Sequence, residues 1–318
     1  ARSHLETILP VVNQALRDAS VTASDIDAIA VTHTPGLVGS LLIGTLTART
    51  LAILWNKPLY AIHHLKSHIY ANWLTPPETP HAQNSHSSRP NLPTFPLLSL
   101  VISGGHTQII YMPRHNNFEI IGTTRDDAIG ECFDKVAKIL GLPYPGGPSI
   151  AKCALNGDPQ KYHLPHPKVS GLDFSFSGLK TAVLRAVQSA CNLPITTPSF
   201  ELAKHLSDQQ KADFAASFQS TACDILLEKL QIAHQTHPEA LSFIFAGGVS
   251  ANQVLRNKAL HDFLNALKRD FSANLTTPPK HPTTKHDSSL STASTSPAIF
   301  FPEPRFTGDN AAMVGAAA

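Results

Sequence analysis

Apolar side chains recur at spacings of three and four residues near the start of the chain. Between residues 3 and 19 this spacing predicts an amphipathic helix. The apolar run at residues 28–32 predicts a short buried strand and residues 58–62 a second short strand, with a helix from Leu41 to Trp55 between them. The glycine-rich turn at residues 35–39 separates the first strand from this helix. Strand, turn, helix and strand in this order indicate an α/β sheet.

The rest of the chain continues the alternation. Apolar runs at residues 97–102 and 107–111 flank the tight turn Ser103-Gly104-Gly105, which predicts a β-hairpin. A further buried strand is expected at residues 243–246, where Gly247-Gly248 stops it. Helical periodicity is expected in three segments: residues 128–140, 179–190 and 208–234.

Two stretches break the pattern. Residues 75–96 are rich in Pro, His, Ser and Asn, and residues 271–298 are rich in Thr, Ser, Pro and Lys. Neither stretch has a helical or strand period, and both are interpreted as low-complexity insertions. They also hold several of the 17 histidines and many of the 25 prolines, so these high counts are partly a property of the insertions.

Length and charge narrow the class of protein. The 318 residues correspond to about two domains at roughly 150 residues each. An apolar fraction of 42% supports a sizeable core, while charged residues make up 15%, against about 25% in ordinary soluble domains. The net charge of +2 neither favours nor excludes an anionic partner. These values exclude fibrous, disulfide-scaffold and wholly disordered proteins.

Thiols and apolar runs bear on the cellular compartment. The four cysteines form no C-x-x-C pair, which fits a reducing compartment and signals neither a zinc knuckle nor a redox motif. The best continuous apolar run, Pro96 to Ile102, has the length of a strand, well short of the ~20 residues of a membrane span. The sequence therefore predicts no membrane association.

A histidine pair is the first candidate for chemistry. His64 and His68 lie four residues apart on an expected helix, so both imidazoles project from one face and can share a metal ion. Leu65 stands where a zinc protease of this pattern has its catalytic Glu, so that route to peptide hydrolysis lacks a base. Asp309 is the candidate third ligand, although an Asp before an Ala-rich run is also an ordinary helix N-cap, as is Thr307. His63 and His106 are competing ligands.

Three glycine-rich turns are the second candidate for a functional site. They are Ser103-Gly104-Gly105, Gly146-Gly147 after Tyr144-Pro145, and Gly247-Gly248. Each lets a ligand approach the backbone without obstruction by Cβ, and together they favour a nucleotide or phosphate cradle between two lobes. None has the pattern of a Rossmann fingerprint or a P-loop.

A carboxylate cluster follows at residues 126–134. Asp126 and Asp127 are explained by the dipole of a helix that begins after them. Asp134 lies deeper, between Phe133 and Val136, where it could accept hydrogen bonds from ribose hydroxyls. Further along, the Ser residues of the 174–180 segment are expected to cap a helix.

These pieces, in this order, resemble the tRNA threonylcarbamoyladenosine transferase family (TsaD). The resemblance spans nearly the whole chain outside the two insertions. The matching stretches are Pro35-Gly36-Leu37-Val38-Gly39-Ser40-Leu41, His64 with His68, Ser103-Gly104-Gly105-His106-Thr107-Gln108, residues 126–135, Tyr144-Pro145-Gly146-Gly147-Pro148, residues 174–180, residues 247–252, and Asp309-Asn310-Ala311-Ala312-Met313. His106 and the acidic 126–135 segment resemble the bacterial and mitochondrial branch.

The resemblance implies an α/β fold of two lobes, of the actin, Hsp70 and sugar-kinase type. Residues 1–96 would form an N-terminal lobe that lacks its opening strands, residues 97–305 a C-terminal lobe, and residues 306–318 a helix returning to the first lobe. The family's activity would be the transfer of a threonylcarbamoyl group from threonylcarbamoyl-AMP to N6 of the adenosine beside the anticodon, in tRNAs that read codons beginning with A.

The family's site residues carry over by position. His64, His68 and Asp309 would hold one divalent metal ion, iron or zinc. The substrate site would be lined by eight residues: Val101, Ile102, Ser103, Gly104, Gly105, Asp134, Gly147 and Asn252.

The resemblance also implies partners and a location. Besides tRNA, we expect a paralogous subunit and a small ATPase in a bacterial protein, or a homodimer in a mitochondrial one. The location would be the cytoplasm, or the mitochondrial matrix if a transit peptide precedes the chain. Two alternatives stay open: a non-catalytic paralogue that serves as a scaffold, and an ATPase or sugar kinase of the same superfamily.

Overall fold

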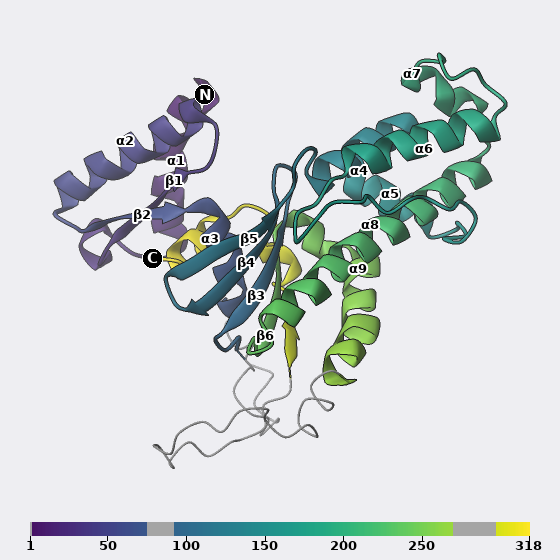
Figure 1. Cartoon of the computed structure of the whole chain (residues 1–318). Coiled ribbons are helices and arrows are strands. Elements are labelled where there is room, and N and C mark those ends of the chain that lie inside the picture. The colour runs from purple at the N-terminus through teal and green to yellow at the C-terminus, as the bar shows by residue number, and fades with distance from the viewer. Residues whose placement is uncertain (1, 75–91, 270–296) are drawn as a thin grey trace, which may run out of the picture. The chain divides into compact units, whose positions relative to one another are not determined.

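The computed structural model describes residues 2–74, 92–269 and 297–318, so most of both predicted insertions lies outside the described residues. The chain divides into two compact units (Figure 1). Unit 1 comprises Ala1–Pro90 and Pro302–Ala318, and unit 2 comprises Asn91–Phe301. The predicted α/β fold class is confirmed, because each unit combines a sheet with helices.

Unit 1 is built on a pair of parallel strands. β1 (Ile29–Thr34) pairs with β2 (Leu59–His63) in parallel, and α2 (Val38–Trp55) forms the crossover between them. The prediction that the first of these strands is buried is wrong, because every residue of β1 is at least partly exposed. Asn56 ends α2 in the left-handed region at φ 48°, a conformation that Asn tolerates better than most residues. The remaining helices of the unit are α1 (Arg2–Asp18), α3 (His64–Tyr70) and α11 (Ala311–Ala316).

Helix α2 is strongly apolar and mostly exposed. Of its residues, Ala48 and Ala52 are buried, while side chains such as Leu42, Leu46 and Ile53 face solvent. By length and composition alone, α2 could cross a membrane, and it is the one such helix among the described residues. The sequence predicts this helix from Leu41 onward but not its potential to span a membrane, because Gly, Ser, Thr and Arg interrupt its apolar runs.

Unit 2 surrounds a five-stranded mixed sheet in the order β5-β4-β3-β6-β7. The central strand β3 is antiparallel to β4 and parallel to β6, and all six of its residues are buried. A strand covered on both faces is expected to be continuously apolar, as this one is except for Ser99. The strands are β3 (Leu97–Ile102), β4 (Thr107–Arg114), β5 (Asn117–Thr123), β6 (Ser242–Ala246) and β7 (Ala298–Phe300).

The helices of unit 2 pack into one hydrophobic core with this sheet. The longest, α8, begins with a capping box in which Ser207 and Gln210 satisfy each other's backbone N–H groups. Its buried face supplies large side chains such as Phe214 and Phe218 to the core. The helices are α4 (Ile129–Ile139), α5 (Gly146–Ala154), α6 (Ser177–Ala190), α7 (Ser199–Leu202), α8 (Asp208–Thr236) and α9 (Gln253–Lys258).

Most predicted elements are present, and the exceptions have local causes. The hairpin of residues 97–111 is confirmed, as are the long helices. Strand β5 was missed because it is half exposed and polar, and α5 was missed because it starts inside the glycine-rich turn at Gly146. Both cases show tertiary packing overriding a weak local pattern.

Candidate metal centre and glycine-rich cradle

His64, His68 and Asp309 come together in unit 1. The Nε2 atoms of His64 and His68 lie 3.5 and 3.2 Å from Asp309 Oδ1. The two imidazole rings are 4.7 Å apart at an angle of 72°. One ligand atom from each of the three residues lies within 4.8 Å of the others, which is close enough to surround a single ion. This group does not include His63 or His106.

Short-range structure explains how the two histidines are placed. β2 ends at His63 and α3 begins at His64, so the sheet fixes the start of the helix. One helical turn then separates His64 from His68 and aligns their side chains. His68 is 1% exposed and His64 is partly exposed, so the site is buried on one side and open on the other.

The third residue arrives from the far end of the chain, because α11 packs against α3. Asn310 is the N-cap of α11, and its Oδ1 accepts a hydrogen bond from the Met313 N–H at 2.8 Å. The prediction that Asp309 or Thr307 caps this helix is therefore wrong. Because Asn310 takes the capping role, the Asp309 carboxylate is left to face the histidines, with its side chain 78% exposed.

The chemistry of these side chains fits a metal ion. Both ring nitrogens of His68 are buried and neither makes a hydrogen bond with the described residues, although Nε2 lies 3.2 Å from Asp309 Oδ1. An orphaned buried nitrogen is costly, and a metal bond at Nε2 would remove part of that cost. Two imidazoles and one carboxylate suit iron or zinc, and three protein ligands leave further positions open to a substrate.

Unit 2 places two glycine-rich turns at one edge of its sheet. The turn Ser103-Gly104-Gly105 follows β3, and Gly247 follows β6, the parallel neighbour of β3. Gly247 has φ +87°, and a Cβ there would lie 2.4 Å from the Ile102 carbonyl oxygen. The carboxyl ends of neighbouring parallel strands are the usual ligand edge of an α/β sheet.

Helix α4 closes on the same turn. The Gly130 N–H donates to the Ser103 carbonyl at 3.2 Å, and a Cβ on Gly130 would lie 2.6 Å from that oxygen. By contrast, a Cβ on Gly104, Gly105 or Gly248 would meet nothing within 4 Å. Gly130 and Gly247 thus allow segments of the backbone to pack closely together. Gly104, Gly105 and Gly248 leave the neighbouring backbone accessible.

Asp134 and Gly146 are in direct contact. The Gly146 N–H donates to Asp134 Oδ1 at 2.7 Å, and a Cβ on Gly146 would lie 2.5 Å from the Asp134 Cα. Gly147 has open space at its Cβ position. Asp134 and Gly146 also line a cavity of about 590 Å³, together with Tyr144 and Phe200.

Asn252 is held rigidly at the start of α9. Its Oδ1 accepts from the Leu255 N–H at 3.1 Å, and its Nδ2 donates to Gln219 Oε1 at 2.8 Å. Gln219 is 3% exposed on α8. The role of Gln219 could not be predicted from the sequence, because one polar residue on a buried helix face gives no local signal of its partner.

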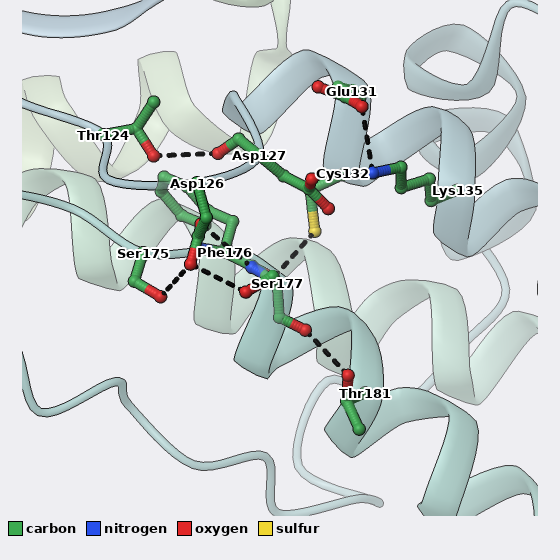
Figure 2. Close-up of polar contacts among 10 residues, drawn as sticks. All are labelled: Thr124, Asp126, Asp127, Glu131, Cys132, Lys135, Ser175, Phe176, Ser177 and Thr181. Atoms are coloured by element: carbon green, nitrogen blue, oxygen red, sulfur yellow. Dashed lines mark hydrogen bonds and ion pairs between the residues drawn. The ribbon is translucent and has the colours of Figure 1, made fainter.

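The acidic segment before α4 has a different role from the predicted one. Asp126 accepts hydrogen bonds from the Ser175 and Ser177 hydroxyls at 2.6 and 2.7 Å, and from the Phe176 N–H at 2.8 Å (Figure 2). It therefore organises the start of α6 rather than complementing the dipole of α4, and the Ser hydroxyls donate to it instead of capping their own helix. Burial raises its pKa, but the hydrogen bonds from Ser175 and Ser177 outweigh burial and lower it.

Asp127 belongs to an ion-pair network on α4. Lys135 Nζ lies 2.6 Å from Asp127 Oδ1 and 2.9 Å from Glu131 Oε1 (Figure 2). Its hydrogen bonds to these two carboxylates raise the pKa of Lys135. Beside the network, burial raises the pKa of the Cys132 thiol to about 12, so this cysteine is no nucleophile.

Fold and site together define a class: a two-unit α/β protein with two histidines and a carboxylate that could hold a metal ion in one unit, and glycine-rich turns at a sheet edge in the other. The model of the family "TsaD: tRNA N6-adenosine threonylcarbamoyltransferase" matches residues 1–316. The chain belongs to this family, which confirms the resemblance seen in the sequence.

Relatives of the same description are similar over most of their length. The tRNA N6-adenosine threonylcarbamoyltransferase of Symbiobacterium thermophilum is 48% identical over 259 residues, covering 81% of this chain and 68% of that protein. Its counterpart in Moorella thermoacetica is 39% identical over 322 residues, covering 100% of this chain and 77% of that protein.

Solved structures of HypF share the fold. Full-length HypF in its phosphate- and nucleotide-bound form superposes with a TM-score of 0.57 at 11% identity, covering 96% of this chain. T. kodakarensis HypF gives a TM-score of 0.57 at 12% identity, covering 100% of this chain. This chain spans 40% and 43% of those two proteins. Because the sequence identity is only 11% and 12%, the likeness concerns the fold alone.

Proposed function

We propose that this chain transfers the threonylcarbamoyl group of threonylcarbamoyl-AMP to N6 of the adenosine beside the anticodon in tRNAs that read codons beginning with A. Membership of the TsaD family supports the reaction. The observation that carries the proposal within this chain is the close approach of His64, His68 and Asp309. A degenerate, non-catalytic scaffold has no need to keep this set together, so that alternative is not favoured.

His64, His68 and Asp309 would hold one divalent ion, iron or zinc. When bound, such an ion supplies Lewis acidity toward substrate oxygens. The protein's own contribution is geometric: α3 fixes both imidazoles, and Asn310 keeps Asp309 out of the helix cap. The exposed side of Asp309 leaves an approach for the substrate.

The turn from Val101 to Gly105 would bind the adenylate through its backbone. Open space at Gly104 and Gly105 lets N–H groups approach the phosphate, which needs no side-chain charge. Asp134, Gly147 and Asn252 would contact the nucleoside. Asp134 Oδ1 already accepts from Gly146, so its second carboxylate oxygen is the one suited to a ribose hydroxyl. Positioning of this kind can provide most of the rate enhancement for a good leaving group such as AMP.

Partners and location extend the same proposal. A paralogous subunit and a small ATPase, or a second copy of this chain, would assemble with it. The apolar side chains exposed on α1 and α2, such as Leu9 and Leu46, support a protein partner for unit 1. We place the protein in the cytoplasm, or in the mitochondrial matrix for an organellar protein, without membrane insertion of α2.

The test pairs His68→Ala with His4→Ala. His68 is buried at the site, whereas His4 is exposed on α1 and provides a control for the loss of an imidazole. We expect His68→Ala to lose bound metal and at least about 100-fold of the transfer rate, because loss of a group that only supports a metal ligand already costs about 10- to 100-fold. Metal analysis and transfer of labelled threonylcarbamoyl to tRNA give the readouts. Full activity of His68→Ala would refute the metal's role in the reaction.

A further inference from the structure

A long irregular segment joins α5 to α6 in unit 2. Residues 158–173, here called the strap, contain no helix and no strand. Structureless connections longer than about 12–15 residues are uncommon in compact domains, and they are usually functional or disordered. The strap is not disordered, because its inner side is attached to unit 2 at several points.

The attachments run along the length of the strap. At its start, the Tyr162 ring stacks on Phe214 of α8 at 3.6 Å, with an angle of 2° between the rings. In the middle, Lys229 Nζ donates to the Val169 carbonyl at 2.9 Å and also binds the Gly171 carbonyl. At its end, Asp173 accepts from the Thr123 N–H at 3.0 Å and pairs with Arg125. The strap is therefore held against α8 and the end of β5.

The outer side of the strap is basic. Lys161, His163, His166 and Lys168 are all exposed, and the acidic residues of the strap lie at its two ends, Asp158 and Asp173. Among the described residues, neither lysine ammonium has an ion-pair partner, whereas His166 pairs with Glu228. Three prolines stiffen the segment, so little backbone entropy is lost when these cations meet a ligand.

The strap is also linked, through residues that follow it in the chain, to the glycine-rich turns Ser103-Gly104-Gly105 and Gly247-Gly248, here called the cradle. Its last residue, Asp173, is followed by the Phe174–Ser177 segment, which Asp126 holds by hydrogen bonds (Figure 2). Asp126 lies shortly before Gly130, which packs on Ser103 of the cradle. A macromolecule bound to the strap would thus contact the same unit that carries the cradle.

We propose that the strap is an RNA-binding surface whose Lys161 and Lys168 contact phosphates of the tRNA substrate. The inference rests on the proposed function. With a net charge of only +2, the chain has no global basic field, so RNA affinity must come from local cations. Phosphate contacts of this type position an RNA without reading its sequence.

The test measures tRNA binding as a function of salt for the full chain and two variants. The first is the double variant Lys161→Gln/Lys168→Gln, and the control is Arg114→Gln, an exposed cation at the end of β4. The probe is an unmodified tRNA transcript that reads a codon beginning with A. We expect the double variant to bind roughly 3- to 10-fold more weakly and to lose about two units of the slope of log K against log salt, one for each phosphate contact.

The outcomes separate the strap from the proposed function. A double variant with the affinity and salt slope of the unaltered chain overturns the strap's role while leaving the transferase proposal intact, provided that the unaltered chain modifies tRNA. Unchanged tRNA binding with loss of a partner subunit assigns the strap to a protein contact and also overturns the inference. An unaltered chain that neither binds nor modifies tRNA, with its partners present, contradicts the proposed function and with it the strap.

Discussion

The two units use apolar residues in opposite ways. In unit 2, α8 buries Phe214, Phe218 and many smaller side chains in a core shared with β3. In unit 1, α2 is more apolar than α8 but fully buries only Ala48 and Ala52 of its residues, and β1 has no fully buried residue. Unit 2 is therefore stabilised by its own core. Unit 1 has fewer fully buried apolar side chains, among them Leu65 and Ile69 of α3.

The largest expected difference between the two units is in the free energy of unfolding lost when an apolar side chain is truncated. Phe218→Ala should lower the free energy of unfolding of unit 2 by about 3–5 kcal/mol, because its ring is fully buried against Phe133. Leu42→Ala in α2, whose side chain is 54% exposed, should cost less than about 0.5 kcal/mol. Urea unfolding measures both. Equal losses would mean that α2 is buried in solution, for example by a partner.

Metal binding should act on unit 1 alone. At a free metal concentration of 100 times Kd, Zn²⁺ or Fe²⁺ should stabilise it by about 2.7 kcal/mol. Both tryptophans, Trp55 and Trp73, lie in unit 1, so their fluorescence reports on its unfolding. Hydrogen exchange of α8 should stay unchanged, and His68→Ala should abolish the shift. Stabilisation that persists in His68→Ala would place the ion elsewhere.

The Asp126 contacts give unit 2 a pH dependence. Because the folded pKa of Asp126 lies below 3.8, its stabilisation is fully present above that value and is lost as the pH falls through the folded pKa. Asp126→Asn should therefore cost about 1–2 kcal/mol at neutral pH, with less effect in strong acid. Urea midpoints between about pH 2.5 and pH 6 check this. Parallel acid profiles of variant and unaltered chain would contradict it.

The smallest expected effect on stability distinguishes Asn310, the N-cap of α11, from Asp309, the proposed metal ligand. Asn310→Ala should destabilise α11 by about 1 kcal/mol, because the Met313 N–H loses its acceptor. Asp309→Asn should leave stability of the metal-free chain nearly unchanged but weaken metal binding. Tryptophan fluorescence during unfolding and metal titration provide the two readouts. Reversed effects of the two substitutions would restore Asp309 as the cap.

Much of the fold follows from local pattern. The continuous apolar run of β3 and the periodicity of α8 were predictable, because strongly periodic segments have few alternatives. β5 was not, since its burial depends on β4 beside it rather than on its own sequence. Within the site, the pairing of His64 with His68 is a property of helical spacing.

What the sequence determined by itself is thus most of the elements, the histidine pair, the glycine turns and the family resemblance. Only the tertiary structure decided that Asn310 rather than Asp309 caps α11, that Asp126 serves α6 rather than α4, and that Gln219 holds Asn252. The reason is physical. Helical and strand periods act over a few residues, whereas each of these hydrogen bonds depends on which elements pack together, and on which of several equivalent donors or acceptors that packing brings within reach.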